Sequence, residues 1–256
     1  MHKQRTVVGI GAALLLQAVS AASHAGLIPM MSANTLYYVP SANMSIHMHS
    51  IVADSIIRHP AVSARPASEV SGTSEAARHA DTAMSFVPSP AVSQEVKRSL
   101  VAEVTRTRDV EAGRQFEEIL ARSDVVGDFN RLLARYGYSG TNVADVMTAY
   151  FVMSWEVVTG HDATPAQIKG VNGQMRESIL TNGHLLRMGD REKQSAAENM
   201  IYQVALSSQS KNELVKKRDA ARLGALRDGV AASMRELGFD FRTLSLTDRG
   251  FVSTVR

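Results

Sequence analysis

Asp145, Glu156 and His161 are the residues of the central region whose side chains could support acid–base chemistry. The two carboxylates fall on one polar stripe of a predicted helix, and the imidazole follows the end of that helix. Asp145 and Glu156 are eleven residues apart, which corresponds to about 16 Å along an α-helix. Because glycosidases hold their two carboxylates much closer together, a catalytic acidic site here would need groups from another element. The alternative is that the stripe is the solvated edge of the helix.

His47 and His49, in the segment SIHMHS, are the residues most suited to hold a metal ion. In an extended segment, side chains two positions apart point to the same side, and imidazoles beside a methionine could bind copper or zinc. Established sites add a further imidazole or a carboxylate, and none follows at a matching spacing. We therefore expect a solvated loop at these residues and no metal or other cofactor.

Several other chemistries are excluded by residue types and motifs that are missing from the chain. The sequence has no Cys, which excludes disulfides, thiolate metal sites and a lipid-modified cysteine. It has no Gly-x-Ser-x-Gly nucleophile motif. Its formal net charge is only +3, and the basic segment 211–227 has no interleaved aromatic residues. We therefore expect no nucleic acid among its partners.

The segment NVADVMTAYFVMSWEVVTG, residues 142–160, predicts the central helix of a soluble bundle. Asn142 or the residue before it can cap the start of this helix, and Gly160 can end it. Apolar residues cover more than half of its circumference, which is typical of a helix packed among other elements. Its uninterrupted apolar run is too short to span a membrane. Tyr150 and Trp155, the only Trp of the chain, are the candidates for a binding surface.

Apolar residues at intervals of three and four, from about residue 91 onwards, predict an all-α domain over residues 91–256. The pattern corresponds to a bundle of about six or seven helices. Near its end the pattern favours separate helices over residues 190–209 and 210–238. The tail that follows alternates apolar and polar residues, which indicates an extended segment packed back on the bundle.

The helix expected over residues 165–183 carries two local signals. Thr164 and Gln167 have the spacing of a capping box at its start. Gly170 and Gly173 lie inside it, although a glycine costs roughly 1 kcal/mol relative to alanine in a helix. The two glycines therefore indicate either a close crossing with another element or a local break.

Residues 1–25 have the three-part layout of a secretory signal peptide. Lys3 and Arg5 give a positive start, an apolar stretch runs from Val7 to Val19, and small residues precede a cut before Gly26. The apolar stretch is shorter than the ~20 residues that a membrane-spanning helix needs, although an uncleaved anchor remains the alternative. We therefore expect a periplasmic or secreted protein with no transmembrane span in its mature form.

The region between the signal peptide and the bundle, residues 26–90, is rich in Ser, Ala and Pro and lacks a sustained period. Such a composition favours a poorly ordered arm or linker. The chain is thus divided into a signal peptide, this arm and a helical domain with an extended tail. A cut after Ala21 or Ala22 is the alternative start of the arm.

The central helix and the tail resemble an uncharacterised group of exported proteobacterial proteins, known only as a domain of unknown function. The resemblance covers about residues 110–252. It rests on Asn142-Val143-Ala144-Asp145, on Ala149-Tyr150 with Trp155, and on Leu246-Thr247 with Gly250-Phe251. Membership of such a group implies export, and it brings no known activity or catalytic residue.

Two functions from different classes are compatible with these observations. The first is a non-enzymatic interaction protein that binds a protein or an envelope component through the arm or a groove beside the central helix. It is favoured because a sound core occurs without a catalytic motif. The second is an envelope hydrolase or another enzyme with an acidic site beside the central helix, since buried carboxylates are often functional.

Overall fold

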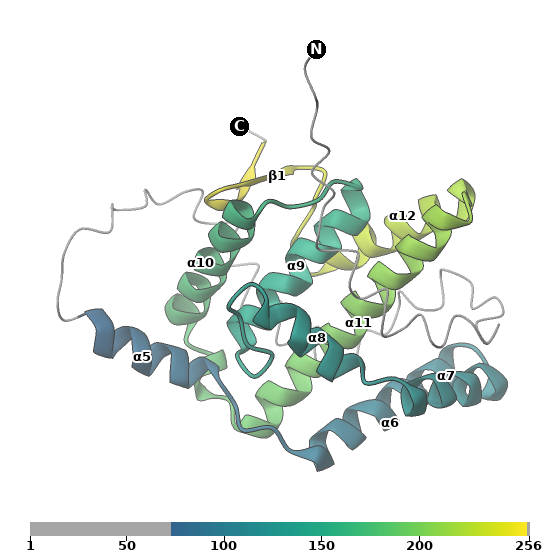
Figure 1. Cartoon of the computed structure of the whole chain (residues 1–256), viewed down its shortest axis with the longest axis horizontal. Coiled ribbons are helices and arrows are strands. Elements are labelled where there is room, and N and C mark those ends of the chain that lie inside the picture. Colours follow the sequence, from purple (N-terminus) through teal and green to yellow (C-terminus); the bar gives the residue numbers. More distant parts are fainter. Residues whose placement is uncertain (1–72, 255–256) are drawn as a thin grey trace.

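The computed structural model describes residues 73–254, and this part of the chain is almost entirely helical (Figure 1). Within it, eight α-helices and a short 3-10 helix precede a two-stranded hairpin. The elements are α5 (Thr73–Met84), α6 (Pro90–Thr107), α7 (Val110–Arg122), α8 (Val125–Ala134), α9 (Val143–Thr159), α10 (Pro165–Asn182), η2 (Leu185–Arg187), α11 (Asp190–Lys216), α12 (Ala220–Glu236), β1 (Leu244–Thr247) and β2 (Gly250–Ser253). The all-α prediction is confirmed.

One helix more than expected occurs in the described part, because α5 lies inside the range 26–90 that was predicted to be a poorly ordered arm. The end of this range is anchored by two apolar side chains in the core, since Met84 is 1% exposed and Phe86 7% exposed. The composition around these residues is rich in Ser and Ala, so the spacing of apolar residues does not identify this helix in the sequence. The signal peptide, the rest of the arm and both His47 and His49 lie outside the described residues.

The helix α9 lies in the middle of the bundle, with α10, α11 and α12 packed around it (Figure 1). Asn142 caps its start, because the side-chain oxygen accepts hydrogen bonds from the N–H groups of Ala144 and Asp145. Gly160 ends the helix in a left-handed conformation with φ of 77°, where a residue without Cβ avoids a steric cost. Both predicted boundaries are therefore confirmed. No helix among residues 73–254 is long and apolar enough to cross a membrane.

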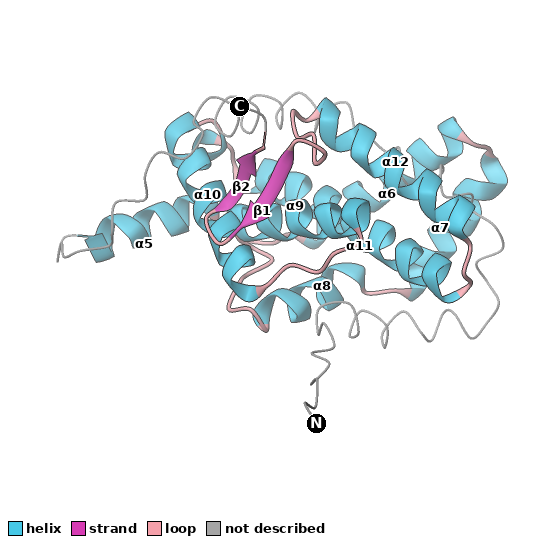
Figure 2. Ribbon diagram, turned by 90° about the horizontal axis from the view of Figure 1, so that it is seen from above, coloured by secondary structure: helices cyan, strands magenta, loops and turns pink. Residues whose placement is uncertain are grey.

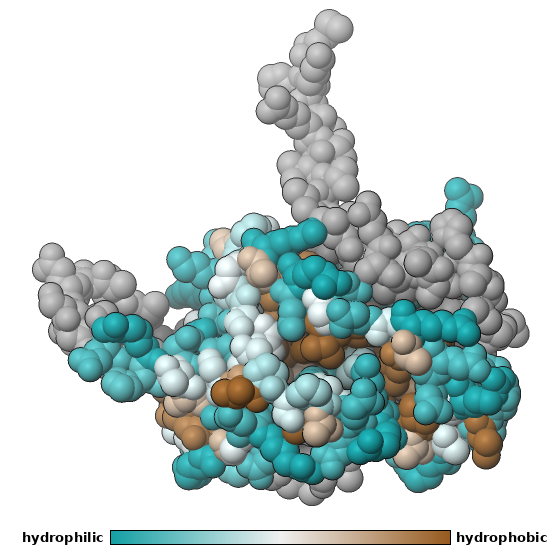
Figure 3. Space-filling model, turned by 60° about the horizontal axis from the view of Figure 1, so that its bottom comes forward, coloured by the Kyte–Doolittle hydropathy of each residue, from teal (hydrophilic) through white to brown (hydrophobic). Residues whose placement is uncertain are grey.

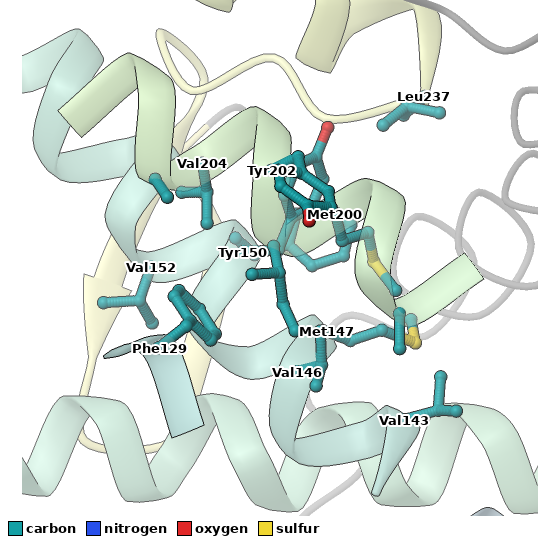
Figure 4. Close-up of a cluster of buried hydrophobic side chains, with 14 of the residues drawn as sticks. Phe129, Val143, Val146, Met147, Tyr150, Val152, Met200, Tyr202, Val204 and Leu237 are labelled. Carbon is teal, nitrogen blue, oxygen red and sulfur yellow. The ribbon is translucent and has the colours of Figure 1, made fainter. Parts of the chain in front are cut away.

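The core is built around the apolar face of α9. Figure 4 shows the buried side chains of this helix, among them Met147 and Tyr150, facing those of the neighbouring helices. Phe129 of α8 and Tyr202 of α11 are among the largest side chains that are fully buried. Burying a side chain of this size contributes roughly 1.5–3 kcal/mol relative to leaving it exposed. Because α10, α11 and α12 all pack against α9, α9 is the element around which the other helices are arranged.

The tail forms an antiparallel hairpin that lies alongside α10 (Figure 2). Gln174 of α10 pairs with the backbone of Phe251 in both directions, each at 2.9 Å. The extended tail predicted from its alternating pattern is therefore confirmed. Gly170 marks a close crossing, as one of the two alternatives predicted, because a Cβ there would lie 2.4 Å from the carbonyl oxygen of Asp248 in the turn. A Cβ added at Gly173 would meet no described atom within 4 Å outside its chain neighbours and the adjacent backbone of α10.

The expected division into helices over 190–209 and 210–238 is wrong. The helix α11 continues without a break to Lys216, and the chain turns at Arg218, whose φ is 55°. Asp219 then caps α12 by accepting a hydrogen bond from the N–H of Arg222. The polar residues around position 209 carry no signal that ends a helix, whereas an Asp directly before a helix is a favoured cap.

Candidate functional site

In the N-terminal half of α9, the polar stripe is buried and is not a solvated edge of the helix. Asp145 is only 4% exposed and Thr148 is fully buried, because α10 packs over this side of α9. Asn172 of α10 donates hydrogen bonds to the Asp145 carboxylate at 2.9 Å and to the Thr148 hydroxyl at 3.1 Å. This half of the stripe is therefore a polar contact between two helices.

The Asp145 carboxylate is fully committed to structural partners. One oxygen accepts a hydrogen bond from the N–H of Ser139 at 2.9 Å, and the other accepts from the guanidinium of Arg176 at 2.9 Å. Arg176 also binds Asp81 of α5 at 2.6 Å. Burial alone would lower the pKa of Arg176, but its hydrogen bond to Asp81 and the charge of Asp145 raise it overall. These contacts tie α5 to α9 and α10.

Glu156 lies three turns further along α9, in different surroundings. Its carboxylate accepts a hydrogen bond from the N–H of Ala163 at 2.9 Å, and its backbone carbonyl accepts one from the ammonium of Lys211 at 3.1 Å. Burial raises the pKa of Glu156, while the Ala163 N–H and the Lys211 charge oppose that shift and the charge of Asp162 adds to it. A partly desolvated carboxyl group of this kind is typical of functional sites.

A pocket lies beside this carboxyl group, between α8, α9, α10 and α11. The space between its atoms measures about 720 Å³, including its opening to solvent. Its walls are mostly apolar, with polar groups concentrated near Glu156 and Lys211. The residues that line it are Leu132, Leu133, Tyr136, Tyr138, Thr148, Ala149, Val152, Met153, Glu156, Val157, Ile168, Ser208, Lys211 and Asn212. An apolar concavity with a few converging polar groups is the usual form of a small-molecule site.

Glu156 is the member of the predicted acidic site that lines this pocket. Asp145 and His161 are not among the lining residues, and among residues 73–254 no hydrogen bond or ion pair joins either of them to Glu156. The His161 side chain is exposed and its ring lies near Trp155, with 6.2 Å between the ring centroids. The structure therefore does not bring the three predicted catalytic residues together.

The two aromatic residues predicted as a binding surface lie outside the pocket lining. The Tyr150 hydroxyl is 3.1 Å from the side-chain oxygen of Gln203, to which it donates a hydrogen bond, and burial raises its pKa. Trp155 is half-buried at the edge of the core. Within the described residues, no group of three or more His, Asp or Glu side chains is placed to hold a metal ion.

The residues that sequence analysis missed lie mainly on α11. Ser208, Lys211 and Asn212 line the pocket, and they continue the three-and-four spacing of the inner face that passes through Ile201 and Val204. Following that spacing past position 209 would have placed Lys211 toward α9. The apolar lining from α8 gives no comparable signal, because leucines on a helix face predict burial and not a concavity.

The comparisons with known proteins identify the family of the chain. A family model described as a family of unknown function, DUF6683, matches residues 3–254. The chain therefore belongs to this family, and the predicted resemblance to an uncharacterised group is confirmed over a wider range than expected. No curated protein and no solved structure matches the chain. That the group is exported and proteobacterial stays a prediction.

Proposed function

We propose that the protein is an exported, non-enzymatic binding protein that holds an apolar part of a protein or envelope component in the pocket beside α9. The observation that carries the proposal is the pocket itself, whose walls come from four helices. Helical cores are normally packed as densely as organic crystals, with few voids larger than a water molecule. An apolar concavity in such a core supports a binding role. The signal-peptide pattern of residues 1–25 supports export.

The enzymatic alternative rests on one specific observation. Glu156 presents a carboxyl group with a raised pKa at the edge of the pocket, which suits a general acid. Against it, Asp145 is held by Arg176 and Asn172, and His161 does not line the pocket. A single carboxyl group without a second acid, base or nucleophile in reach favours binding over catalysis.

The proposal is tested by titrating the protein with N-phenyl-1-naphthylamine, a neutral apolar probe whose fluorescence rises when it leaves water. The test variant is Ala149→Leu, which adds a larger side chain inside the pocket. The matched control is Ala232→Leu, at an exposed position of α12. We expect saturable binding by the wild type and the control, and a loss of affinity of about tenfold or more in Ala149→Leu, equivalent to about 1.4 kcal/mol.

Two outcomes would overturn the proposal. One is the absence of saturable binding by the wild type, and the other is equal binding by Ala149→Leu. The enzymatic alternative is addressed by incubating the same proteins with p-nitrophenyl decanoate. Hydrolysis by the wild type that disappears in Glu156→Gln, while probe binding persists, would replace the binding role with a catalytic one.

A further inference from the structure

We propose that the ligand of the pocket is a fatty carboxylate, a single acyl chain whose carboxylate head is bound by the ammonium of Lys211. This inference rests on the proposed function and names its ligand class. The shape of the pocket indicates an acyl chain, and the position of one cation indicates a carboxylate head group. These two observations do not depend on each other.

The shape of the pocket follows one stripe of α9. The lining residues of this helix form two adjacent rows along its axis, with Thr148, Val152 and Glu156 in one and Ala149, Met153 and Val157 in the other. Each row is about 12 Å long at the rise of an α-helix. A row of this length beside apolar side chains matches an extended chain of medium length and not a compact or branched group.

The walls from α8 and α10 beside these rows are mostly apolar, whereas α11 contributes Ser208, Lys211 and Asn212. Leu132 and Leu133 of α8 close one side, and Ile168 of α10 lies on another. Met153 of α9 also lines the pocket, and the flexible methionine side chain adapts to ligands of variable shape. Each methylene group of a chain buried here contributes about 0.8 kcal/mol. The acyl chain of the ligand therefore supplies affinity, while the polar end of the pocket selects the head group.

Lys211 is the lining residue that carries a positive charge. An ammonium group has three N–H donors, and the hydrogen bond of Lys211 within the described residues goes to the backbone carbonyl of Glu156 at 3.1 Å. Two donors therefore remain for a ligand. The carboxylate of Glu156 takes its hydrogen bond from the Ala163 N–H, and no ion pair of 4.0 Å or less joins it to Lys211 in the described part of the chain.

The polar end of the pocket holds one cation, Lys211, and one carboxyl group, Glu156, so it matches a head group with no more than a single negative charge. A phosphate group usually receives several Lys or Arg donors, whereas the pocket lining contains Lys211 alone. The Asn212 amide and the Ser208 hydroxyl lie in the same lining and can donate further hydrogen bonds to a carboxylate. A fatty carboxylate therefore satisfies both ends of the pocket better than a phospholipid head does.

The test compares four ligands that share one chain and differ in the head: decanoate, decanol, decylamine and decyl phosphate. Each is titrated against the protein loaded with N-phenyl-1-naphthylamine, and its affinity is taken from displacement of the probe. The test variant is Lys211→Met, which removes the charge and keeps most of the length. The control is Lys217→Met, at an exposed position directly after α11.

We expect decanoate to bind the wild type and Lys217→Met at least about tenfold more tightly than the other three ligands, a difference of about 1.4 kcal/mol. In Lys211→Met this advantage disappears, while decanol binds as before. Equal binding of decanoate and decanol, tighter binding of decylamine or decyl phosphate, or an unchanged preference in Lys211→Met would overturn the head-group assignment. Probe binding without displacement by any chain would overturn the acyl-chain assignment. Failure of the wild type to bind the probe would instead overturn the proposed function.

Discussion

The two carboxyl groups of the α9 stripe have different roles because their neighbours differ. Asp145 is surrounded by N–H donors and by the guanidinium of Arg176, which stabilises its charge in the buried position. Glu156 has one backbone N–H donor and a partly desolvated position in the pocket. At the scale of single residues, Asp145 holds the fold together and Glu156 lines the pocket.

Replacing Arg176 by Met tests the structural role of the Asp145 pair. The change leaves a buried carboxylate without its charged partner, so we expect the free energy of unfolding to fall by about 2–4 kcal/mol. The control is Arg191→Met, since Arg191 pairs with Glu95 on the surface, where both side chains are well exposed. Loss of an exposed pair costs less than about 1 kcal/mol. Urea denaturation measures both, and equal effects of the two variants would contradict the assignment.

Replacing Glu156 by Gln tests the raised pKa of this group. A carboxyl whose pKa is raised by folding adds stability below its ordinary value of 4.5, and this contribution is lost as the pH rises through the folded value. Gln keeps an oxygen for the Ala163 N–H and does not titrate. We therefore expect the wild type to lose stability relative to Glu156→Gln as the pH rises above the ordinary pKa of 4.5. Thermal unfolding at several pH values measures this, and a difference that stays constant or changes in the opposite direction would refute it.

At the scale of elements, the hairpin is held against α10 by specific contacts. The backbone of Phe251 pairs with Gln174, and the carbonyl of Leu246 accepts a hydrogen bond from the side chain of Gln167. Gly170 lies directly under the turn. The hairpin thus covers the side of α10 on which Gly170 lies. The two elements approach closely because Gly170 has no Cβ.

The two glycines of α10 provide an internally controlled test of this contact. A Cβ at position 170 would meet backbone atoms of the turn at 2.4–2.6 Å, so we expect Gly170→Ala to lower the free energy of unfolding by about 1–3 kcal/mol. Gly173→Ala places its Cβ in open space beside α10 and should raise the free energy of unfolding by about 0.5–1 kcal/mol through helix propensity. Chemical denaturation of both variants decides the matter. The same sign for both would contradict the close crossing.

The elements that sequence predicted correctly are those that local signals define. The capping box of Thr164 and Gln167 is present as expected, because both hydrogen bonds lie within one turn. The end of α11 was missed, since the left-handed Arg218 that ends it depends on tertiary context. The pocket was missed for a similar reason. Its walls come from four helices. The spacing of residues along one helix does not indicate where the side chains of several helices leave a space between them.

At the scale of the whole molecule, the large apolar side chains exposed among the described residues do not gather on one element. Figure 3 shows a mostly hydrophilic face that is interrupted by separate apolar areas. The large apolar side chains exposed among residues 73–254 are on separate elements: Val87, Val110, Tyr136, Leu180 and Val215. Tyr136 also lines the pocket, so the opening of the pocket is the place where exposed and buried apolar surfaces meet.

The prediction that concerns the molecule as a whole is that the protein is exported. Ser23 and Ala25 stand three residues and one residue before the predicted cut, where small side chains are required. We expect the protein recovered from the periplasmic or extracellular fraction of its host to begin at Gly26, as measured by N-terminal sequencing. Ala25→Arg should accumulate unprocessed. Recovery of the wild type only in the cytoplasm, with Met1 intact, would contradict export.

Nuclear magnetic resonance of methyl-labelled protein with decanoate bound shows directly whether the ligand lies beside α9. Val152, Val157 and Ile168 line the pocket, whereas Leu180 and Val215 are exposed elsewhere. We expect intermolecular contacts from the acyl chain to the first three residues and none to the other two. Contacts confined to exposed methyl groups, or no contacts at all under saturating decanoate, would contradict a ligand site beside α9.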